Sequence, residues 1–373
     1  MTRRTDIAWR NLSRERTRLA ISVGGVAFAV ILIIIIRGLY SGITAQATAY
    51  IRSVDADIWV AQSGTPGDFY HSISLMPERT SEALARVDGV RDVQPLIGRP
   101  VVFQHDGQDV DLYLLSVDPE RPVSGPPRSV SGARVPGRGE ILVDQVFADN
   151  SGVAVGDTLS IRGRDLTVSG IAGGGNTVMS QFAWTSTEDA RALLGAADAV
   201  NYFLIRTAEG LEVADVVARI EREVQGVKPL TREEFMTRNT ADLREGFLPI
   251  VLVLVVIALV IGTAIIGLTI YTATIEKRRE YGVLKAIGFS IGSLARVVVR
   301  QAMFAAVLGL GSGLLLSEVL RRVLSATTPS FVTQVGVADV AVVTVAALAM
   351  SLLAALLPIR PLARLDPAAV FRV

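Results

Sequence analysis

The chain has 373 residues, half of them hydrophobic and 20% charged, and its mean hydropathy is +0.44. Soluble domains carry about 25% charged residues, so this composition excludes a wholly soluble chain of average type. The formal net charge of +1 provides no overall field for nucleic acid, and we expect no nucleic-acid partner. Cysteine is absent, which excludes disulfides, zinc–thiolate sites and cysteine nucleophiles, and two histidines leave little room for a histidine metal cluster.

The first predicted element is a transmembrane helix over residues 19–37. It follows residues 1–18, an amphipathic segment with six arginines that we assign to the cytosol. The run from Leu19 to Ile36 contains no charged residue and spans about 27 Å, close to the thickness of the hydrocarbon core. A signal peptide cleaved near Ala45 and Ala47 is the alternative, but the apolar run is longer than a signal core and Arg37 separates it from these alanines.

Residues 38–245 predict an extracytoplasmic α+β domain mounted on two helices. Apolar residues keep a near-helical spacing from Leu39 to Val54, so we expect the first helix to continue as a stalk. Thr231 and Glu234 fit a capping box that starts a second stalk. Between the stalks we expect strands at 58–60, 101–103 and 112–117 and helices at 81–87 and 213–224. The similar segments 87–91 and 224–228 suggest two related helix–turn–strand units.

A β-rich subdomain is predicted as an insertion in this domain, over about residues 124–180. A Pro/Gly-rich stretch introduces it, and short strand patterns follow at 140–143, 158–161 and 166–171. Asp68, His71 and Glu78 are the candidates for a metal site, but their spacing fits no ligand pattern and a solvated loop is favoured. We therefore predict no metal site and, since no catalytic constellation is visible, no enzyme activity in this chain.

Three further apolar stretches predict transmembrane helices at 246–275, 297–317 and 340–359. Buried core helices of a soluble protein are the alternative, but four such stretches with charged flanks exceed what a core contains. Arginine and lysine number six before the first span, six between the second and third, two between the third and fourth, and three after the fourth. This distribution predicts a multi-pass protein of the bacterial cytoplasmic (inner) membrane, with both termini, including the tail 360–373, in the cytosol and the large domain outside.

The segment between the second and third spans, residues 276–290, predicts a short amphipathic helix on the cytosolic face. Its first half is densely charged, and Tyr281, Leu284 and Ile287 follow at helical spacing. Gly288 can end the helix with a left-handed cap. Such a helix would present charge and a narrow apolar ridge to a partner protein, whereas a solvated loop needs neither feature. In the third span, Gly309 and Gly313 resemble part of a phosphate loop but lie mid-span without a lysine, so we assign them to helix packing.

These motifs together resemble the FtsX-like, MacB-type (type VII) permeases of ABC transporters over nearly the whole chain. The resemblance rests on Ala8-Trp-Arg-Asn-Leu12 with the arginines that follow, on Arg279-Glu-Tyr-Gly-Val-Leu-Lys-Ala-Ile-Gly288, on the order of the four spans, and on Leu365-Asp-Pro-Ala-Ala-Val-Phe-Arg372. The segment from Trp9 to Val30 and the segment 57–60 are most similar to the DevC branch of stand-alone exporter permeases. Unlike MacB itself, the chain contains no Gly-x-x-x-x-Gly-Lys-Ser/Thr loop.

The resemblance implies a coupling helix that docks on a separate ABC ATPase subunit, which would bind the ATP and Mg²⁺ that this chain lacks. The residues it assigns to that contact are Glu276, Lys277, Arg278, Arg279, Glu280, Tyr281, Gly282, Leu284, Lys285, Ile287 and Gly288. It also implies a homodimer or heterodimer of permeases, a MacB-like outer domain, contact with membrane lipid, and in some relatives a membrane-fusion adaptor or lipoprotein.

Two functions remain open at this level. The first is export or extraction of a cargo, driven by the partner ATPase through motion of the outer domain. The second is a transmembrane regulator that activates an extracytoplasmic enzyme, such as a cell-wall hydrolase, without transport. The spans carry almost no ionisable residues, so the sequence shows no polar pathway through the bilayer. This favours work done outside the membrane or on cargo embedded in lipid.

Overall fold

The computed structural model describes residues 16–67, 69, 74–174, 181–195, 198–327 and 333–363. The motifs at 8–12 and 365–372, and Asp68 and His71, lie outside these residues. The chain divides into two compact units, each described here by itself. The helical unit is formed by Met1–Ser41, Phe247–Thr328 and Thr333–Val373, and the α+β unit by Gly42–Gly246 and Pro329–Val332.

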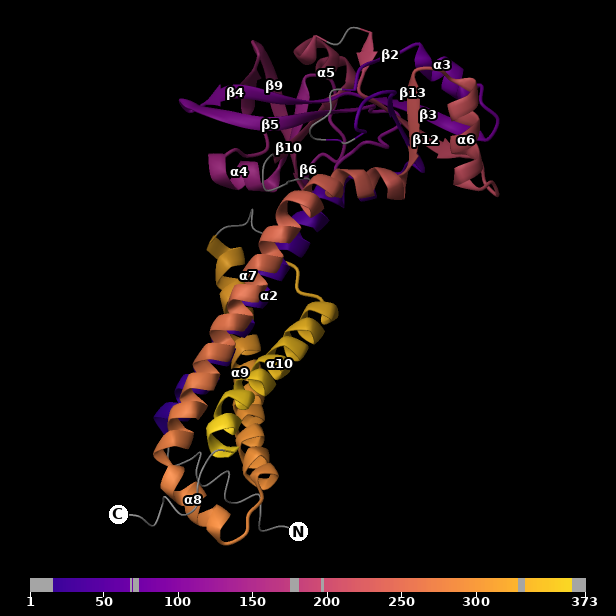
Figure 1. The fold of residues 1–373 in the computed structure, drawn as a ribbon. Coiled ribbons are helices and arrows are strands. Elements are labelled where there is room, and N and C mark those ends of the chain that lie inside the picture. Colours follow the sequence, from indigo (N-terminus) through magenta and orange to yellow (C-terminus); the bar gives the residue numbers. More distant parts are fainter. Residues whose placement is uncertain are drawn as a thin grey trace. The chain divides into compact units, whose positions relative to one another are not determined.

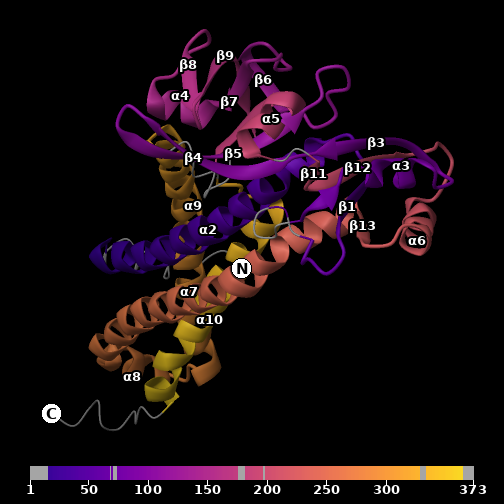
Figure 2. The same cartoon turned by 90° about the horizontal axis from the view of Figure 1, so that it is seen from above.

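A four-stranded antiparallel sheet forms one half of the α+β unit. Its strand order is β13-β1-β12-β3, with β1 at Ile58–Gln62, β3 at Val90–Leu96, β12 at Tyr202–Thr207 and β13 at Val227–Thr231. Helix α3 (Thr80–Ala85) packs on β3 and helix α6 (Val213–Glu223) packs on β13 (Figure 2). The chain order β1-α3-β3-β12-α6-β13 is that of a split βαβ fold of ferredoxin-like type. The two helix–turn–strand units predicted from the sequence repeat are α3-β3 and α6-β13.

A seven-stranded sheet forms the other half and is inserted between β3 and β12. It comprises β4 (Gly98–His105), β5 (Gln108–Val117), β6 (Arg128–Gly132), β7 (Glu140–Asp144), β8 (Thr158–Ile161), β9 (Arg164–Gly173) and β10 (Gln181–Ser186). The order is β4-β5-β10-β7-β9-β6, with β8 paired to β9, and α4 (Gln145–Ser151) and α5 (Thr187–Leu194) accompany it. A small ladder of β2 (Met76–Pro77) and β11 (Ala199–Val200) completes the unit.

The inserted sheet extends beyond the predicted bounds of 124–180. Strands β4 and β5, which the sequence placed in the surrounding α+β part, pair with each other, and β5 pairs in parallel with β10. The sheet therefore runs from Gly98 to Ser186. The difference arises because the pairing of β5 with β10 joins residues about 70 positions apart, which no local pattern encodes.

The central strand β1 is buried on both faces because its residues alternate between two hydrophobic cores. Ile58 and Val60 face the core that includes α3 and α6. Trp59 faces a second core that is rich in aromatic side chains. That core also takes Tyr50 from the end of the first long helix and Phe235 from the start of the second. The ends of both long helices are therefore packed into one aromatic cluster of the α+β unit.

Hydrogen bonds reinforce this aromatic cluster. The Tyr50 hydroxyl donates to the Ser124 carbonyl at 2.9 Å, and the Phe69 backbone N–H donates to Asn239 Oδ1 at 2.6 Å. The Thr231–Glu234 capping box is confirmed: the Thr231 N–H donates to Glu234 Oε2 at 3.0 Å, and the Glu234 N–H donates to Thr231 Oγ1 at 3.2 Å. The capped helix therefore has its first turn fixed within the α+β unit.

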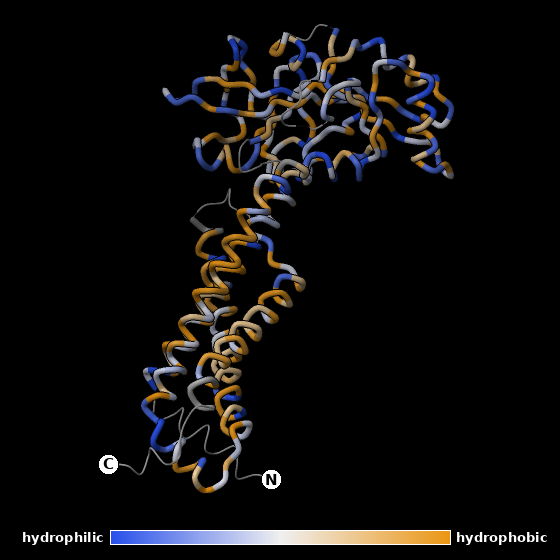
Figure 3. Tube along the Cα trace, in the orientation of Figure 1, coloured by the Kyte–Doolittle hydropathy of each residue, from blue (hydrophilic) through white to orange (hydrophobic). Residues whose placement is uncertain are grey.

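Among the residues that the structure describes, four helices are long and apolar enough to cross a membrane. They belong to α2 (Arg16–Ser53), α7 (Arg232–Glu276), α9 (Ile291–Thr327) and α10 (Val337–Ala363), with the short α8 (Arg278–Ala286) between α7 and α9 (Figure 1). Their hydrophobic stretches are visible in the hydropathy-coloured trace (Figure 3). The predicted fold class, four membrane helices with an α+β domain carrying an inserted β-rich part, is confirmed.

Each predicted stalk is continuous with its predicted membrane span, as the sequence interpretation expected. Helix α2 continues past Arg37 to Ser53, as predicted, and includes Ala45 and Ala47 within it. Helix α7 runs without interruption from Arg232 to Glu276. Both helices therefore contribute residues to the helical unit and to the α+β unit.

Candidate partner-binding surface

The segment 276–290 forms a turn, a nine-residue helix and a defined stop. Helix α7 ends at Glu276, and α8 follows after Lys277. At its C-terminus, Gly288 has φ +97°, its N–H donates to the Lys285 carbonyl at 3.1 Å, and the Phe289 N–H donates to the Leu284 carbonyl at 3.0 Å. This pair of bonds is a Schellman motif, in which a left-handed residue satisfies the last carbonyls of a helix. Gly288 therefore ends α8 in the way its sequence position predicted.

One side of α8 packs into the helical unit. Tyr281 is half-buried and contacts the hydrophobic core of the bundle, and Gly282 is buried. The exposed apolar side chains of this segment lie elsewhere, at Val283, Ile287, Phe289 and Ile291, and we call them the α8 patch. Ile287 is 68% exposed and Phe289 is 44% exposed. Exposed apolar groups of this size at the end of a membrane bundle, rimmed by charge, are typical of a protein-binding surface.

The predicted apolar ridge is therefore rotated relative to the surface that the structure presents. The sequence assigned Tyr281, Leu284 and Ile287 to one partner-facing side, yet Tyr281 contacts the bundle and Leu284 is only partly exposed. Val283 and Phe289 were not identified as candidates. The charge density around them, combined with their position beside a glycine stop, is the signal that could have found them.

Charged side chains surround the α8 patch. Arg278, Arg279 and Glu280 are exposed, and Lys285 lies in the last turn of α8, where a cation is favoured by the helix dipole. Glu276 is bonded by the guanidinium of Arg18 in α2. This ion pair ties the start of α2 to the end of α7, so Glu276 has a role within the bundle beside any role toward a partner.

The two predicted packing glycines lie on α9 against α2, apart from the α8 segment. A Cβ atom added to Gly309 would lie 2.4 Å from Val26 Cβ, and one added to Gly313 would lie 2.7 Å from Val30 Cγ1. Distances below 3.0 Å leave no room for a side chain. The absence of a Cβ at both positions is therefore what allows α9 and α2 to approach so closely.

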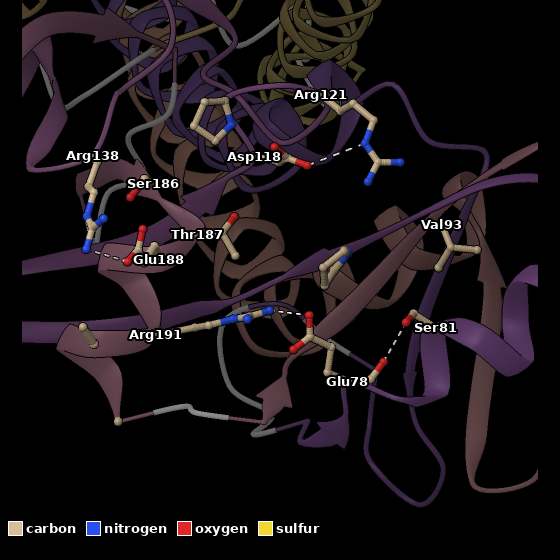
Figure 4. A pocket seen from close by; sticks show the side chains of 14 residues that line it. Glu78, Ser81, Val93, Asp118, Arg121, Arg138, Ser186, Thr187, Glu188 and Arg191 are labelled. Atoms are coloured by element: carbon tan, nitrogen blue, oxygen red, sulfur yellow. Dashed lines mark hydrogen bonds and ion pairs between the residues drawn. The ribbon is translucent and has the colours of Figure 1, made fainter.

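A polar groove of about 950 Å³ lies in the α+β unit, between its two halves. Glu78, Ser81 and Val93 line it from the side of the four-stranded sheet, and Arg138 and Arg191 line it from the inserted part (Figure 4). The charges in the groove are paired: Arg191 bonds Glu78, and Arg138 Nη2 lies 2.8 Å from Glu188 Oε1. Among the described residues no group of three or more His, Cys, Asp or Glu side chains could hold a metal ion.

Comparisons with known proteins match two parts of the chain to two family models. Residues 19–223 match the family model of the MacB-like periplasmic core domain, and residues 252–367 match that of the FtsX-like permease C-terminal region. The first of these matches covers more than half of the chain.

Relatives of similar length support the same grouping. A Mycobacterium tuberculosis (H37Rv) protein described as an uncharacterized ABC transporter permease is 26% identical, covering 98% of this chain and 97% of that protein. A second permease of the same description from this organism is 24% identical, and the match covers 98% of both chains.

The crystal structure of the periplasmic region of MacB from Actinobacillus actinomycetemcomitans is similar to part of the fold, with a TM-score of 0.38 and 10% identity over 49% of this chain and 92% of that one.

Proposed function

Because the chain belongs to the FtsX-like permeases of ABC transporters with a MacB-like periplasmic core domain, we propose that it couples ATP hydrolysis on a separate ATPase subunit to motion of its α+β unit. The cargo class is left open, and the work is export or extraction. In this proposal ATP and Mg²⁺ bind the partner ATPase, and this chain supplies the coupling surface. The permease itself is a non-enzymatic component.

The observation that carries the proposal is the α8 patch with its charged rim. Four apolar side chains are exposed in a segment that also offers Arg278 and Arg279, and a Schellman stop fixes its conformation. A preformed surface loses little conformational entropy on binding, which favours a stable subunit contact. We assign the ATPase contact to the α8 patch, with Arg278 and Arg279 beside it.

The continuity of α2 and α7 supports the mechanical half of the proposal. Helix α7 begins with a capped turn in the α+β unit and ends one residue before α8. Displacement of α8 by an ATPase would act directly on the end of α7. The ion pair between Arg18 and Glu276 would transmit the displacement from α7 to α2. This is a form of mechanotransmission in which no substrate crosses the bundle.

The same proposal sets localisation and assembly. We place the chain in the bacterial cytoplasmic (inner) membrane with both termini in the cytosol, and we expect two permease copies, in a homodimer or heterodimer. A membrane-fusion adaptor or lipoprotein is the partner expected for an exporter. The two Mycobacterium tuberculosis relatives are described as ABC transporter permeases, and those descriptions specify no cargo.

The test is a paired substitution in the α8 patch. Ile287→Ser with Val283→Ser removes exposed apolar surface without touching the bundle core, and we expect at least tenfold weaker association with the ABC ATPase that co-purifies with the wild-type chain. Tyr281→Phe, which keeps the bundle contact, is the matched control and should leave association unchanged. The measurements are co-purification and ATP turnover of the complex reconstituted in membranes. Unchanged association and turnover in the double variant would remove α8 from the ATPase contact.

The regulatory alternative is separated from export by the partner on the other side of the membrane. Cross-linking of the full chain in intact cells, with a reagent that does not enter the cytosol, captures the protein bound to the α+β unit. A cell-wall hydrolase supports the regulator, and an adaptor or lipoprotein supports export or extraction.

A further inference from the structure

An apolar cavity of about 170 Å³ lies among α2, α9 and the start of α10. Ile34 and Ile35 line it from α2, Leu314 from α9, and Val335 and Val340 from the start of α10 and the residues before it. It lies at the end of the helical unit remote from α8, since α8 precedes the first turn of α9 whereas Leu314 is in its second half. An apolar cavity of roughly 150 Å³ is large enough to hold a benzene-sized hydrocarbon. This one can hold a comparable length of hydrocarbon chain.

A polar pocket of about 710 Å³ adjoins the cavity. Glu318, Arg321, Thr333 and Val335 line both spaces, and Asp339 lines the polar one. The segment before α10, which contributes Thr333 and Val335 to the lining, is bonded to α2: the Gln334 N–H donates to the Gly38 carbonyl at 3.1 Å. Apolar and charged surfaces therefore meet in one continuous site, which is the pattern that an amphiphile requires.

The charges around the polar pocket sum to an excess of one cation. Glu318 accepts bonds from Arg321 Nε and from Arg322 Nε, each at 2.8 Å. Asp339 accepts from Arg37 Nε at 2.9 Å, and its side chain is only 8% exposed. Three arginines thus bond two carboxylates: Arg321 lines the pocket itself, and Arg37 and Arg322 bond its two carboxylates from outside the lining. The excess positive charge attracts an anion and disfavours a cation at the same place.

Arg321 is the side chain placed to bind that anion. Its Nε and Nη2 atoms are bonded to Glu318, which leaves the Nη1 edge of the guanidinium without a partner among the described residues. Arginine binds phosphate oxygens through such N–H groups and is more weakly hydrated than lysine, so it suits a site at the edge of a membrane.

We propose that this site holds one anionic phospholipid of the membrane, with part of a hydrocarbon chain in the cavity and the phosphate at Arg321. A phospholipid is the occupant because it combines a hydrocarbon chain with a phosphate group, and it is present at high concentration around membrane helices. A choline headgroup would bring its own cation to a site that already has one in excess. The site is independent of the ATPase contact, and its test needs no ATPase.

The test uses native mass spectrometry of the full chain in detergent, titrated with dioleoylphosphatidylglycerol or dioleoylphosphatidylcholine. We expect one saturable site that binds the anionic lipid about tenfold more tightly than the zwitterionic one. Arg321→Gln should abolish this preference. Leu314→Trp fills the cavity and should weaken both lipids about tenfold, whereas the neighbouring Leu315→Trp, at a position 69% exposed, should leave both unchanged.

Three results would overturn the proposal. The first is equal affinity of the wild-type chain for the two lipids, a measurement that requires no variant to fold. The second is equal weakening by Leu314→Trp and Leu315→Trp. The third is displacement of the bound lipid by millimolar inorganic phosphate, which would show a free-anion site in place of a lipid site. If Leu314→Trp does not fold, Val340→Phe fills the same cavity from α10 and is held to the same expectation.

Discussion

Trp59 stacks on Phe235, with ring centroids 4.6 Å apart and ring planes inclined by 11°. Both side chains are fully buried. The contact joins the central strand β1 to the first turn of α7, and Phe69 and Tyr202 pack around the same pair. A displacement of the start of α7 would therefore act on the middle of the four-stranded sheet.

Phe235→Ala should destabilise the α+β unit by about 3–5 kcal/mol, because it removes a fully buried aromatic ring and leaves a cavity against Trp59. Phe247→Ala, on the same helix at a position that is half exposed, is the control and should change stability by less than about 0.5 kcal/mol. The measurement is hydrogen exchange of the β1 amides in the full chain. Equal protection in the two variants would show that the stacked pair contributes little to the sheet.

The capping box at the start of α7 gives a second prediction. Thr231→Ala and Glu234→Ala each remove one of the two reciprocal bonds, and each should cost about 1 kcal/mol in the stability of the first turn. Thr237→Ala is the control, since its hydroxyl donates to the Glu233 carbonyl inside the helix. Hydrogen exchange at residues 232–236 reports the loss. A Thr237→Ala effect as large as that of the two capping variants would contradict the assignment.

Packing of α9 on α2 provides the third prediction. Gly309→Ala places a Cβ 2.4 Å from Val26 Cβ and should destabilise the bundle by about 1–3 kcal/mol through overpacking. Gly311→Ala has no atom within 4 Å of the new Cβ and should be neutral or stabilising, since alanine favours a helix. Thermal unfolding of the full chain in detergent measures both.

A compensating change separates a local clash from a general effect of alanine at Gly309. Val26→Gly combined with Gly309→Ala removes both the Cβ and the Cγ1 atoms of Val26 that the new Cβ would meet, so the double variant should lose less stability than the sum of the two single variants. If the stability loss of the double variant equals the sum of the losses of the two single variants, the two positions do not interact.

Local sequence patterns predicted the elements of this fold because each depends on nearby residues. The apolar runs located the membrane helices, and the Thr231–Glu234 spacing located the start of α7, whose two capping bonds span three residues. Sheet membership could not be predicted in this way. Strand β5 pairs with β10 about 70 positions later, and that choice depends on the packed unit as a whole.

The orientation of α8 was also beyond the sequence, for a different reason. Helical spacing shows which residues share a side, but it does not show toward which neighbour that side points. Tyr281 packs on the bundle because a large ring gains more from burial there than Val283 would, and this turns Val283 outward. Ile287 and Phe289 are exposed because the Schellman stop changes the chain direction between them. The assignment of this segment to an ATPase contact stays a prediction.

The ion pair of Arg37 with Asp339 joins residues 302 positions apart and supports the last prediction. Asp339 is nearly buried and serves two groups: Oδ1 accepts from Arg37 Nε at 2.9 Å and Oδ2 accepts from the Gly336 N–H at 3.0 Å. Asp339→Asn keeps an acceptor for Gly336 but loses the charge that Arg37 faces, and we expect a loss of about 1–2 kcal/mol. Asp339→Ala also leaves the Gly336 N–H unpaired, so it should cost about 1 kcal/mol more.

A double-mutant cycle with Arg37→Met isolates the pair from the cap. If the ion pair stabilises the bundle, Asp339→Asn should cost clearly less in the Arg37→Met background than in the wild-type chain, with a coupling energy of about 0.5–3 kcal/mol. The additional cost of Asp339→Ala over Asp339→Asn should persist in both backgrounds, because Gly336 keeps its need for an acceptor. The measurement is unfolding of the full chain in detergent. Additive costs in the cycle would show that Arg37 and Asp339 do not stabilise each other, and would leave the capping bond as the sole contribution of Asp339.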